Sequence, residues 1–376
     1  MAIDPKKFLG ELEYNKISFF SGVPDSLLKE FCLCLDERMT KKQHIIAPNE
    51  GNAIALAAGH YLATGDLPMV YMQNSGIGNA VNPLLSLCDS DVYSIPLIMM
   101  VGWRGEPGVK DEPQHIKQGK IQIELLEALG LPYEILSKSD KEYVEKINRL
   151  VEISKTEKRP TILLIKKGTF EKFKTDKKKP EIQKMTREEA LEIILENVGE
   201  DTIIVSTTGK TSREIFEIRK KNGQLHHQDF LTVGSMGHCS SIALGIAFAK
   251  PNREVLCIDG DGAMLMHLGA LTTIASQKPK NFHHILMNNE VHESVGGQDT
   301  AAKNIDLSLM VASTQTIQTF KAQTDSELKS KLGDFMMPNG PNFLEVKIKP
   351  GSREDLGRPT ISPKDNKNDF MNFLKK

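Results

Sequence analysis

The chain has 376 residues and a formal net charge of -1 at pH 7, which suits two domains with separate cores and gives no reason to expect nucleic acid or an anionic membrane as a partner. No run of about 18 apolar residues is present, and the first residues lack the apolar core of a signal peptide. The five cysteines include no CxxC pair, as is usual in a reducing compartment, so we expect a cytoplasmic protein that acts on small molecules.

In the first half of the chain, short apolar runs alternate with helical patterns. These runs predict strands at 17–20, 44–47, 69–73, 96–101, 133–136 and 161–166. Strands separated by about one helix length predict right-handed β-α-β units and a parallel sheet. Residues 171–184 are rich in lysine and have no apolar periodicity, so they are predicted to form a solvated linker.

The same alternation returns after residue 184. It predicts strands at 202–207, 229–233, 254–259, 283–288, 318–320 and 343–348. We therefore expect an α/β protein with two doubly wound parallel-sheet domains, residues 1–170 and residues 185–376, the second including a C-terminal tail. Ligands of such sheets bind beyond the carboxyl ends of the strands, so the loops that follow the strands are expected to hold the chemistry.

Polar residues follow two predicted strands of the second half. Asp261 lies in the string GDGA after one strand, and Asn289 lies in the string NNE after the next. Because neighbouring parallel strands end side by side, the side-chain oxygens of both are expected to bind one cation, with a backbone carbonyl near Val291 as a third ligand. Oxygen ligands suit Mg²⁺, and the N–H groups of Gly262 and Ala263 would face a phosphate. A plain strand-to-helix turn is the alternative.

The spacing of GDG and NN resembles the diphosphate and magnesium motif of thiamine diphosphate-dependent decarboxylases. Similarity to the two-domain members of this family extends over nearly the whole chain. It implies a domain that binds the cofactor's aminopyrimidine, a domain that binds its diphosphate, and no middle domain. The strings that support it are FFSGVPDSLLKEFC (19–32), VGWRGEPGVKDEPQHIKQG (101–119), NNEVHESVGGQ (288–298) and GSREDLGRPT (351–360).

The resemblance also assigns cofactor-binding residues. It implies that Glu50, after the second strand, shares a proton with the aminopyrimidine, a role that suits a buried carboxyl with a raised pKa. The alternative is that Glu50 only stabilises the N-terminus of a helix. Ser75 and Gly76 resemble the turn that faces the cofactor in the same domain. Thr208 and Gly209 resemble the loop around the diphosphate.

A third cofactor segment contains Ser235 and Met236. It resembles the stretch in which an apolar side chain holds the cofactor in a bent form, and a plain core methionine is the alternative. Two nucleotide-binding motifs are excluded, the P-loop and the dinucleotide-binding fingerprint. The string at 206–212 lacks the glycine that a P-loop needs, because Ile204 stands there, and the string at 75–81 lacks the third glycine of a dinucleotide site.

The substrate-binding residues are expected in the loop 102–120. It has no helical periodicity and is long enough to be functional. Arg104, Lys110 and Gln118 suit a substrate with a carboxylate and a phosphonate, and His115 resembles a histidine that moves protons near the substrate. A solvated surface loop is the alternative.

Four further residues complete the expected site. Asp25 resembles a catalytic carboxylate of the family's first domain, and an N-cap of the following helix is the alternative. His292 lies three residues past Asn289 and is expected to face the reacting centre. Arg353 and Arg358, in the tail, are expected to close over the phosphonate.

The resemblance implies decarboxylation of a 2-keto acid. Among the two-domain members, the expected substrate is 3-phosphonopyruvate, which yields phosphonoacetaldehyde and CO2 in phosphonate biosynthesis. It also implies a homodimer or tetramer with active sites between subunits. The alternatives are sulfopyruvate as the substrate, an acetolactate-type carboligation, and a non-catalytic phosphate-binding or assembly protein.

Overall fold

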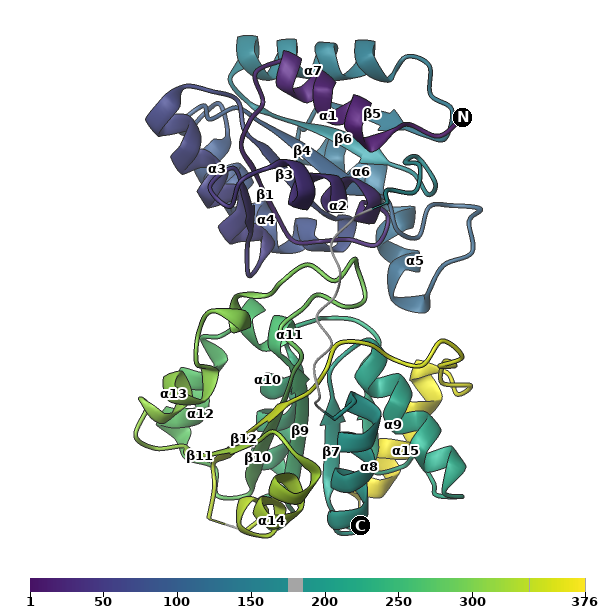
Figure 1. The fold of residues 1–376 in the computed structure, drawn as a ribbon, viewed down its shortest axis with the longest axis vertical. Helices are drawn as coiled ribbons and strands as arrows, with labels where there is room; N and C mark the ends of the chain where they lie inside the picture. The colour runs from purple at the N-terminus through teal and green to yellow at the C-terminus, as the bar shows by residue number, and fades with distance from the viewer. Residues whose placement is uncertain (175–184, 338, 376) are drawn as a thin grey trace. The chain divides into compact units, whose positions relative to one another are not determined.

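A computed structural model describes residues 1–174, 185–337 and 339–375. The chain divides into two compact units, Met1–Lys178 and Lys179–Lys376, each built around its own parallel sheet (Figure 1). Within the described residues each sheet has six strands, as the sequence predicts for an α/β protein of two such domains. None of the described helices is both long and apolar enough to cross a membrane.

The sheet of the first unit has the order β2-β1-β3-β4-β6-β5. Its strands are β1 (Phe20–Gly22), β2 (His44–Ile46), β3 (Met69–Gln73), β4 (Leu97–Gly102), β5 (Tyr133–Leu136) and β6 (Pro160–Ile165). Its helices are α1 (Pro5–Tyr14), α2 (Lys29–Arg38), α3 (Glu50–Thr64), α4 (Ile77–Pro83), α5 (Pro113–Lys120), α6 (Gln122–Ala128) and α7 (Tyr143–Glu157), with the short turns η1 (Asn74–Gly76) and η2 (Leu84–Cys88).

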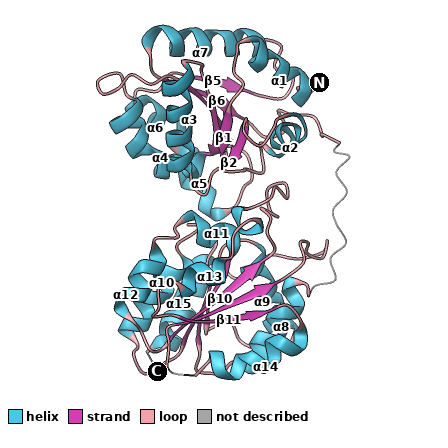
Figure 2. Ribbon diagram, turned by 60° about the vertical axis from the view of Figure 1, so that its left-hand side comes forward, coloured by secondary structure: helices cyan, strands magenta, loops and turns pink. Residues whose placement is uncertain are grey.

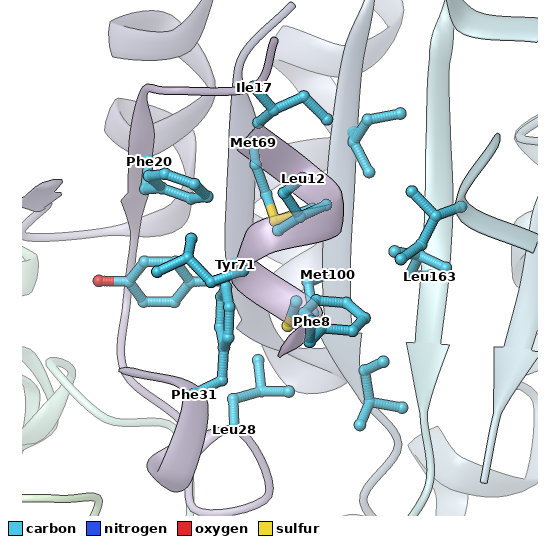
Figure 3. Close-up of a cluster of buried hydrophobic side chains, with 14 of the residues drawn as sticks. Phe8, Leu12, Ile17, Phe20, Leu28, Phe31, Met69, Tyr71, Met100 and Leu163 are labelled. Carbon is cyan, nitrogen blue, oxygen red and sulfur yellow. The ribbon is translucent and has the colours of Figure 1, made fainter. Parts of the chain in front are cut away.

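Alternate residues of β3 explain how this sheet is covered on both faces. Met69 and Tyr71 pack with α1, α2 and α7, in the cluster that Figure 3 shows around Phe8 and Phe31. Val70 and the other alternate residues of the strand pack instead with α3, α4 and α6. Side chains of a strand point alternately to its two faces, so a sheet covered twice requires a continuous apolar run.

The second unit repeats this architecture with the order β11-β12-β10-β9-β7-β8. Its strands are β7 (Ile203–Ser206), β8 (Asp229–Leu231), β9 (Val255–Gly260), β10 (Phe282–Asn288), β11 (Gln318–Ala322) and β12 (Asn342–Lys347). Helices flank both faces of the strands (Figure 2). They are α8 (Arg187–Asn197), α9 (Lys210–Lys221), α10 (Cys239–Ala249), α11 (Asp261–Met266), α12 (Ala270–Gln277), α13 (Leu307–Ala312), α14 (Asp325–Phe335) and α15 (Pro363–Leu374), with the short turn η3 (Ala301–Lys303).

Every predicted strand is present, but the first is displaced. The prediction of 17–20 is wrong for most of its length, because β1 pairs with its neighbours only from Phe20 onward. Ile17 is fully buried without belonging to the strand. An apolar run reports burial, whereas a strand also requires partners for its backbone hydrogen bonds.

The predicted linker has two parts. Residues 171–174 lie on the first unit, where the N–H of Glu171 donates to the carbonyl of Ile3 and the N–H of Phe173 donates to Glu30 at 2.7 Å. Phe173 is also partly buried against the core of that unit. The rest of the predicted linker, 175–184, lies outside the described residues.

Candidate active site

The expected diphosphate residues follow four adjacent strands of the second unit. The strands β10, β9, β7 and β8 are consecutive neighbours in the sheet. Met287 of β10 lies opposite Gly260 of β9, and Asp261 and Asn289 follow directly after the two strands. The register of the two neighbouring strands therefore places both residues together, beyond the carboxyl ends of β9 and β10.

Asp261 is a buried carboxyl without a charged partner at hydrogen-bond distance among the described residues. It opens α11, is 3% exposed, and accepts a hydrogen bond from the hydroxyl of Thr300. Burial raises its pKa to about 6. A buried carboxylate whose side-chain partner is a neutral hydroxyl is an oxygen ligand that a bound divalent cation would stabilise, so this position fits Mg²⁺.

The amide of Asn289 is oriented on both sides. Its Nδ2 donates to Glu293 at 2.9 Å, and its Oδ1 accepts from the N–H of Val291 at 3.1 Å. Glu293 in turn pairs with Arg187 at 3.1 Å and with Lys210 at 2.6 Å. An amide oxygen has two lone pairs, so Oδ1 retains one for a cation. Glu293, Arg187 and Lys210 are not among the residues predicted from the sequence.

The segment after Asn289 is folded back on itself. Val291 forms an antiparallel bridge with Asp299, and the N–H of His292 donates to the carbonyl of Gln298 at 2.7 Å. This shape fixes the position of His292 relative to α11. Burial lowers the pKa of His292 to about 4, so its ring is neutral near pH 7 and can accept or donate one proton.

Gly262 is the point where several predicted residues meet. A Cβ added to Gly262 would lie 3.1 Å from Cε1 of His292 and 3.6 Å from Cε of Met236. An added Cβ would therefore crowd His292 and would come into ordinary contact with Met236. Ala263, the next residue of α11, is buried and its carbonyl lies close to Gly237. The loops after β8, β9 and β10 are thus in mutual contact.

The remaining predicted residues of this unit lie on the same loops. Gly209 has a φ of 98°, which favours glycine, and precedes α9, and a Cβ there would lie 3.8 Å from the hydroxyl of Ser294. Thr208 is partly exposed. Ser235 is exposed and its hydroxyl lies 3.1 Å from Nδ1 of His238. Because Gly209 follows β7 and Ser294 follows β10, their short distance shows that the loops after these two strands lie close together.

In the first unit, Glu50 lies in a tight and largely apolar place. It is the first residue of α3, after the N-cap Asn49, and is 5% exposed. A Cβ added to Gly76 would lie 2.5 Å from Cγ of Glu50, so the carboxyl packs against bare backbone. Asn79 donates to its Oε2 at 2.8 Å, and burial raises its pKa. This carboxyl can hold a proton at a higher pH than an exposed glutamate.

A second buried carboxyl of this unit belongs to Asp25. Gln73 donates to its Oδ1 at 2.7 Å, the N–H of Leu27 donates to its Oδ2 at 2.8 Å, and Ser75 donates to Gln73 at 2.6 Å. Burial raises the pKa of Asp25, which is fully buried. The expected site residues Asp25 and Ser75 are thus connected through Gln73, which was not predicted.

The alternative reading of Asp25 as the N-cap of the next helix is wrong. The N-cap of α2 is Leu28, which forms no side-chain cap. The three residues between Asp25 and Lys29 form a turn, and Asp25 binds the N–H of Leu27 within it. The turn delays the helix, so the sequence pattern placed the helix start too early.

The loop 102–120 is less irregular than predicted. Residues Pro113–Lys120 form α5, with proline in its first turn. Proline has no N–H to lose at this position and its fixed φ suits a helix start. The sequence concealed the helix because its two turns carry mostly polar residues.

Arg104 is paired within its own unit. Its guanidinium donates twice to Asp111, at 2.8 Å and 2.5 Å, and to the hydroxyl of Ser26 at 2.9 Å. Asn74 binds its backbone, donating to the Arg104 carbonyl at 2.9 Å. An anionic substrate would therefore have to compete with Asp111 for this arginine.

The other residues of this loop differ in exposure. Lys110 is exposed and Gln118 is partly exposed. His115 is buried in α5, and its Nδ1 has no hydrogen-bond partner among the described residues. Burial, followed by the charge of Arg104, lowers its pKa to about 4. This ring nitrogen is neutral and buried, and a substrate could reach it only after a local movement.

The structure does not favour the predicted role of Arg353. Its guanidinium pairs with Glu217, with Glu188 at 3.1 Å and with Asp355 at 3.0 Å. It borders a cavity of about 480 Å³ whose other charged residues are mostly acidic: Glu188, Glu189, Glu192, Glu217 and Lys221. Such a cavity repels a phosphonate. Arg358 is exposed in the same tail.

Comparison with known proteins identifies the family of the chain. Residues 7–126 match the N-terminal TPP binding domain of thiamine pyrophosphate enzymes, and residues 207–346 match the C-terminal TPP binding domain. Phosphonopyruvate decarboxylases of Streptomyces hygroscopicus and Streptomyces viridochromogenes are both 32% identical over 95% of the chain, which covers 90% and 91% of their lengths. Sulfopyruvate decarboxylase of Methanosarcina acetivorans is 29% identical over 98% of the chain and 97% of its own length.

Proposed function

Because this chain belongs to the family of thiamine pyrophosphate enzymes, we propose that it decarboxylates 3-phosphonopyruvate to phosphonoacetaldehyde and CO2, with thiamine diphosphate and Mg²⁺ bound. Its similarity to two phosphonopyruvate decarboxylases over nearly the whole chain supports this substrate. The structural observation that supports the chemistry best is the Glu50 carboxyl, buried against Gly76 and held by Asn79. The aldehyde would then enter phosphonate biosynthesis.

The residues of both units fit the cofactor. When bound, thiamine diphosphate supplies a carbon nucleophile and accepts the electron pair that is left as CO2 departs. Glu50 would hold a proton against the aminopyrimidine, since its raised pKa keeps the carboxyl protonated closer to neutral pH. Asp261, Asn289 and the Val291 carbonyl would hold Mg²⁺, and the N–H groups that open α11 would bind the diphosphate.

The substrate would be bound and protonated by polar residues of both units. Arg104 and Lys110 would bind its anionic groups, with Gln118 as a neutral hydrogen-bond partner. His115 and His292 are the candidates for moving the final proton, because burial keeps both rings neutral. Asp25, held by Gln73, is a third candidate.

The proposal includes self-association. In this proposal a homodimer or tetramer forms, with each active site between subunits. Leu56 and Leu62 of α3 are exposed, at 37% and 70%, so a second copy of the chain could cover them. Sedimentation velocity of the purified chain tests this step, and a monomer at micromolar concentration would contradict it.

The assay compares three keto acids. The purified chain is mixed with thiamine diphosphate and Mg²⁺, and CO2 release from phosphonopyruvate, sulfopyruvate and pyruvate is measured. The highest kcat/KM is expected for phosphonopyruvate. A higher value for sulfopyruvate would favour the second candidate, which the similarity to the Methanosarcina acetivorans enzyme supports. No CO2 from any of the three would contradict the proposal.

Product analysis separates decarboxylation from carboligation. We expect a free aldehyde, whereas an acetolactate-type enzyme would release a coupled product. A non-catalytic binding protein would give neither product, and its Glu50→Gln variant would keep both ligand binding and every other measurable function.

A further inference from the structure

Three potential metal ligands meet inside the second unit, apart from the residues considered for Mg²⁺. Cys257 and Asp259 lie two positions apart on β9, so their side chains share one face of the sheet. His284 of β10 lies opposite Cys257 in the sheet register. The thiol, a carboxylate oxygen and a ring nitrogen all lie within 4.8 Å of one another.

The polar atoms of this group are buried and poorly satisfied. Cys257 and Asp259 are fully buried and His284 is 2% exposed. Within the described parts of the chain, neither ring nitrogen of His284 has a hydrogen-bond partner, and neither has Oδ2 of Asp259. The shortest approach between these two side chains is 3.8 Å, from Nε2 to Oδ2, which is too long for a hydrogen bond. Buried polar groups without partners are costly, and such groups call for a ligand.

A second cysteine lies beside the group. The Sγ of Cys239, at the start of α10, is 3.5 Å from the Sγ of Cys257. Both thiols are buried, and burial raises the pKa of each. Zinc binds the thiolate form of cysteine, so Cys257 would bind the ion as a deprotonated side chain.

We propose that Cys257, Asp259 and His284 form a second metal site, distinct from the Mg²⁺ site, which binds one Zn²⁺, and that Cys239, now bound to the carbonyl of Val205, moves in as a fourth ligand. Sulfur, nitrogen and oxygen ligands suit zinc, whereas Mg²⁺ prefers oxygen alone. Ligand atoms around tetrahedral zinc lie about 3.3–3.8 Å apart, so the three side chains have to contract by roughly an ångström and Cys239 has to move further.

The site is structural in character. It would join β9, β10 and α10 just before Asp261 opens α11, and its ligands are buried, so the ion enters during folding or local opening. The inference does not depend on the proposed reaction. A chain that failed to decarboxylate any keto acid could still bind zinc here.

Metal analysis of the full-length chain tests the proposal. The protein is produced with zinc in the medium and dialysed against EDTA, and its metal content is measured by mass spectrometry. We expect about one zinc per wild-type chain and at least a tenfold loss in Cys257→Ser and His284→Gln. The matched control is Cys88→Ser, a buried cysteine of the first unit, which should keep its zinc. Wild-type protein without zinc, or equal zinc in all variants, would overturn the proposal.

A spectroscopic test on the wild-type chain applies even if the ligand variants do not fold. The wild-type chain is unfolded in a denaturant that contains a chelator and is then refolded with Co²⁺. The absorption bands of tetrahedral, thiolate-bound cobalt are expected. Asp261→Asn should keep these bands, because its carboxyl belongs to the other site. Refolded protein without the bands contradicts the site, and bands lost in Asp261→Asn contradict its independence from the Mg²⁺ site.

Discussion

The two units hold their polar residues by different means. In the first unit, the buried carboxyls of Glu50 and Asp25 accept hydrogen bonds from the neutral amides of Asn79 and Gln73. In the second, the buried carboxyl of Asp261 also has a neutral partner, the hydroxyl of Thr300, but Asn289 is oriented by Glu293, whose charge is balanced by two basic residues. Neutral partners leave the pKa of a buried carboxyl raised, whereas charged partners hold it down. The first arrangement suits proton transfer and the second suits anchoring of ions.

Substituting Asp261 is the strongest test of this comparison between the two units. We expect Asp261→Ala to abolish decarboxylation, because the cation and with it the cofactor are lost. The loss should exceed about 1000-fold in kcat/KM, which is about 4 kcal/mol of transition-state free energy. Calorimetric titration with thiamine diphosphate and Mg²⁺ measures binding directly. Normal cofactor affinity in the variant would show that the metal assignment is wrong.

Glu50→Gln should act on the reaction and spare binding. Loss of a group that transfers a proton typically lowers the rate about 100- to 10,000-fold, so we expect kcat to fall within this range. The cofactor affinity should stay within about threefold of wild type, since the amide keeps the shape of the side chain. A kcat close to wild type would remove Glu50 from the mechanism.

Gly76→Ala tests the contact between backbone and carboxyl. The added Cβ would overlap with Glu50 and displace it, so we expect kcat to fall by about 100-fold, the lower end of the range for loss of the proton-transfer group. The matched control is Gly78→Ala, where a Cβ meets nothing within 4 Å. Equal activity of the two variants would mean that the position of Glu50 is not critical.

Glu293→Gln should weaken the cation site indirectly. Residues that orient metal ligands typically contribute 10- to 100-fold to affinity, and we expect a loss of this size for Mg²⁺. Glu134→Gln, which breaks an ion pair with Arg149 in the first unit, is the control. If both variants bind Mg²⁺ equally, the orientation of Asn289 does not depend on Glu293.

The smallest effect concerns pH. With a pKa of about 6, Asp261 is ionised at pH 7 and mostly protonated at pH 5, where a proton competes with the cation. The dissociation constant for Mg²⁺ should therefore rise by about tenfold between pH 7 and pH 5. Titrations at both values measure it. An affinity that does not change with pH would contradict the raised pKa of Asp261.

Local patterns in the sequence predict part of this site and conceal the rest. Alternating apolar runs predict the sheets, strand ends locate Asp261 and Asn289, and the resemblance to the family assigns Glu50. The partners of these residues follow no local pattern, because Thr300 is 39 positions from Asp261 and Asn79 is 29 positions from Glu50. Only the folded chain brings them together.

The predicted role of the tail arginines could not include their partners in the folded chain. An arginine after the last strand suggested an anion site, but three carboxylates from separate segments surround Arg353. The helix α5 was missed for a related reason, since polar residues cover most of its surface. The contacts of Arg353 join segments that are distant in the sequence, and the start of α5 depends on the single turn that Pro113 opens.

The register between β9 and β10 sets a limit on length changes in this protein. Met287 faces Gly260, and the two oxygen-bearing residues follow one and two positions later. Inserting one residue into either strand would shift one of them by about 3.3 Å relative to the other, whereas oxygen ligands must lie about 2.1 Å from Mg²⁺. Insertions and deletions in active relatives are therefore expected at the opposite edge of the sheet, where the chain enters these strands.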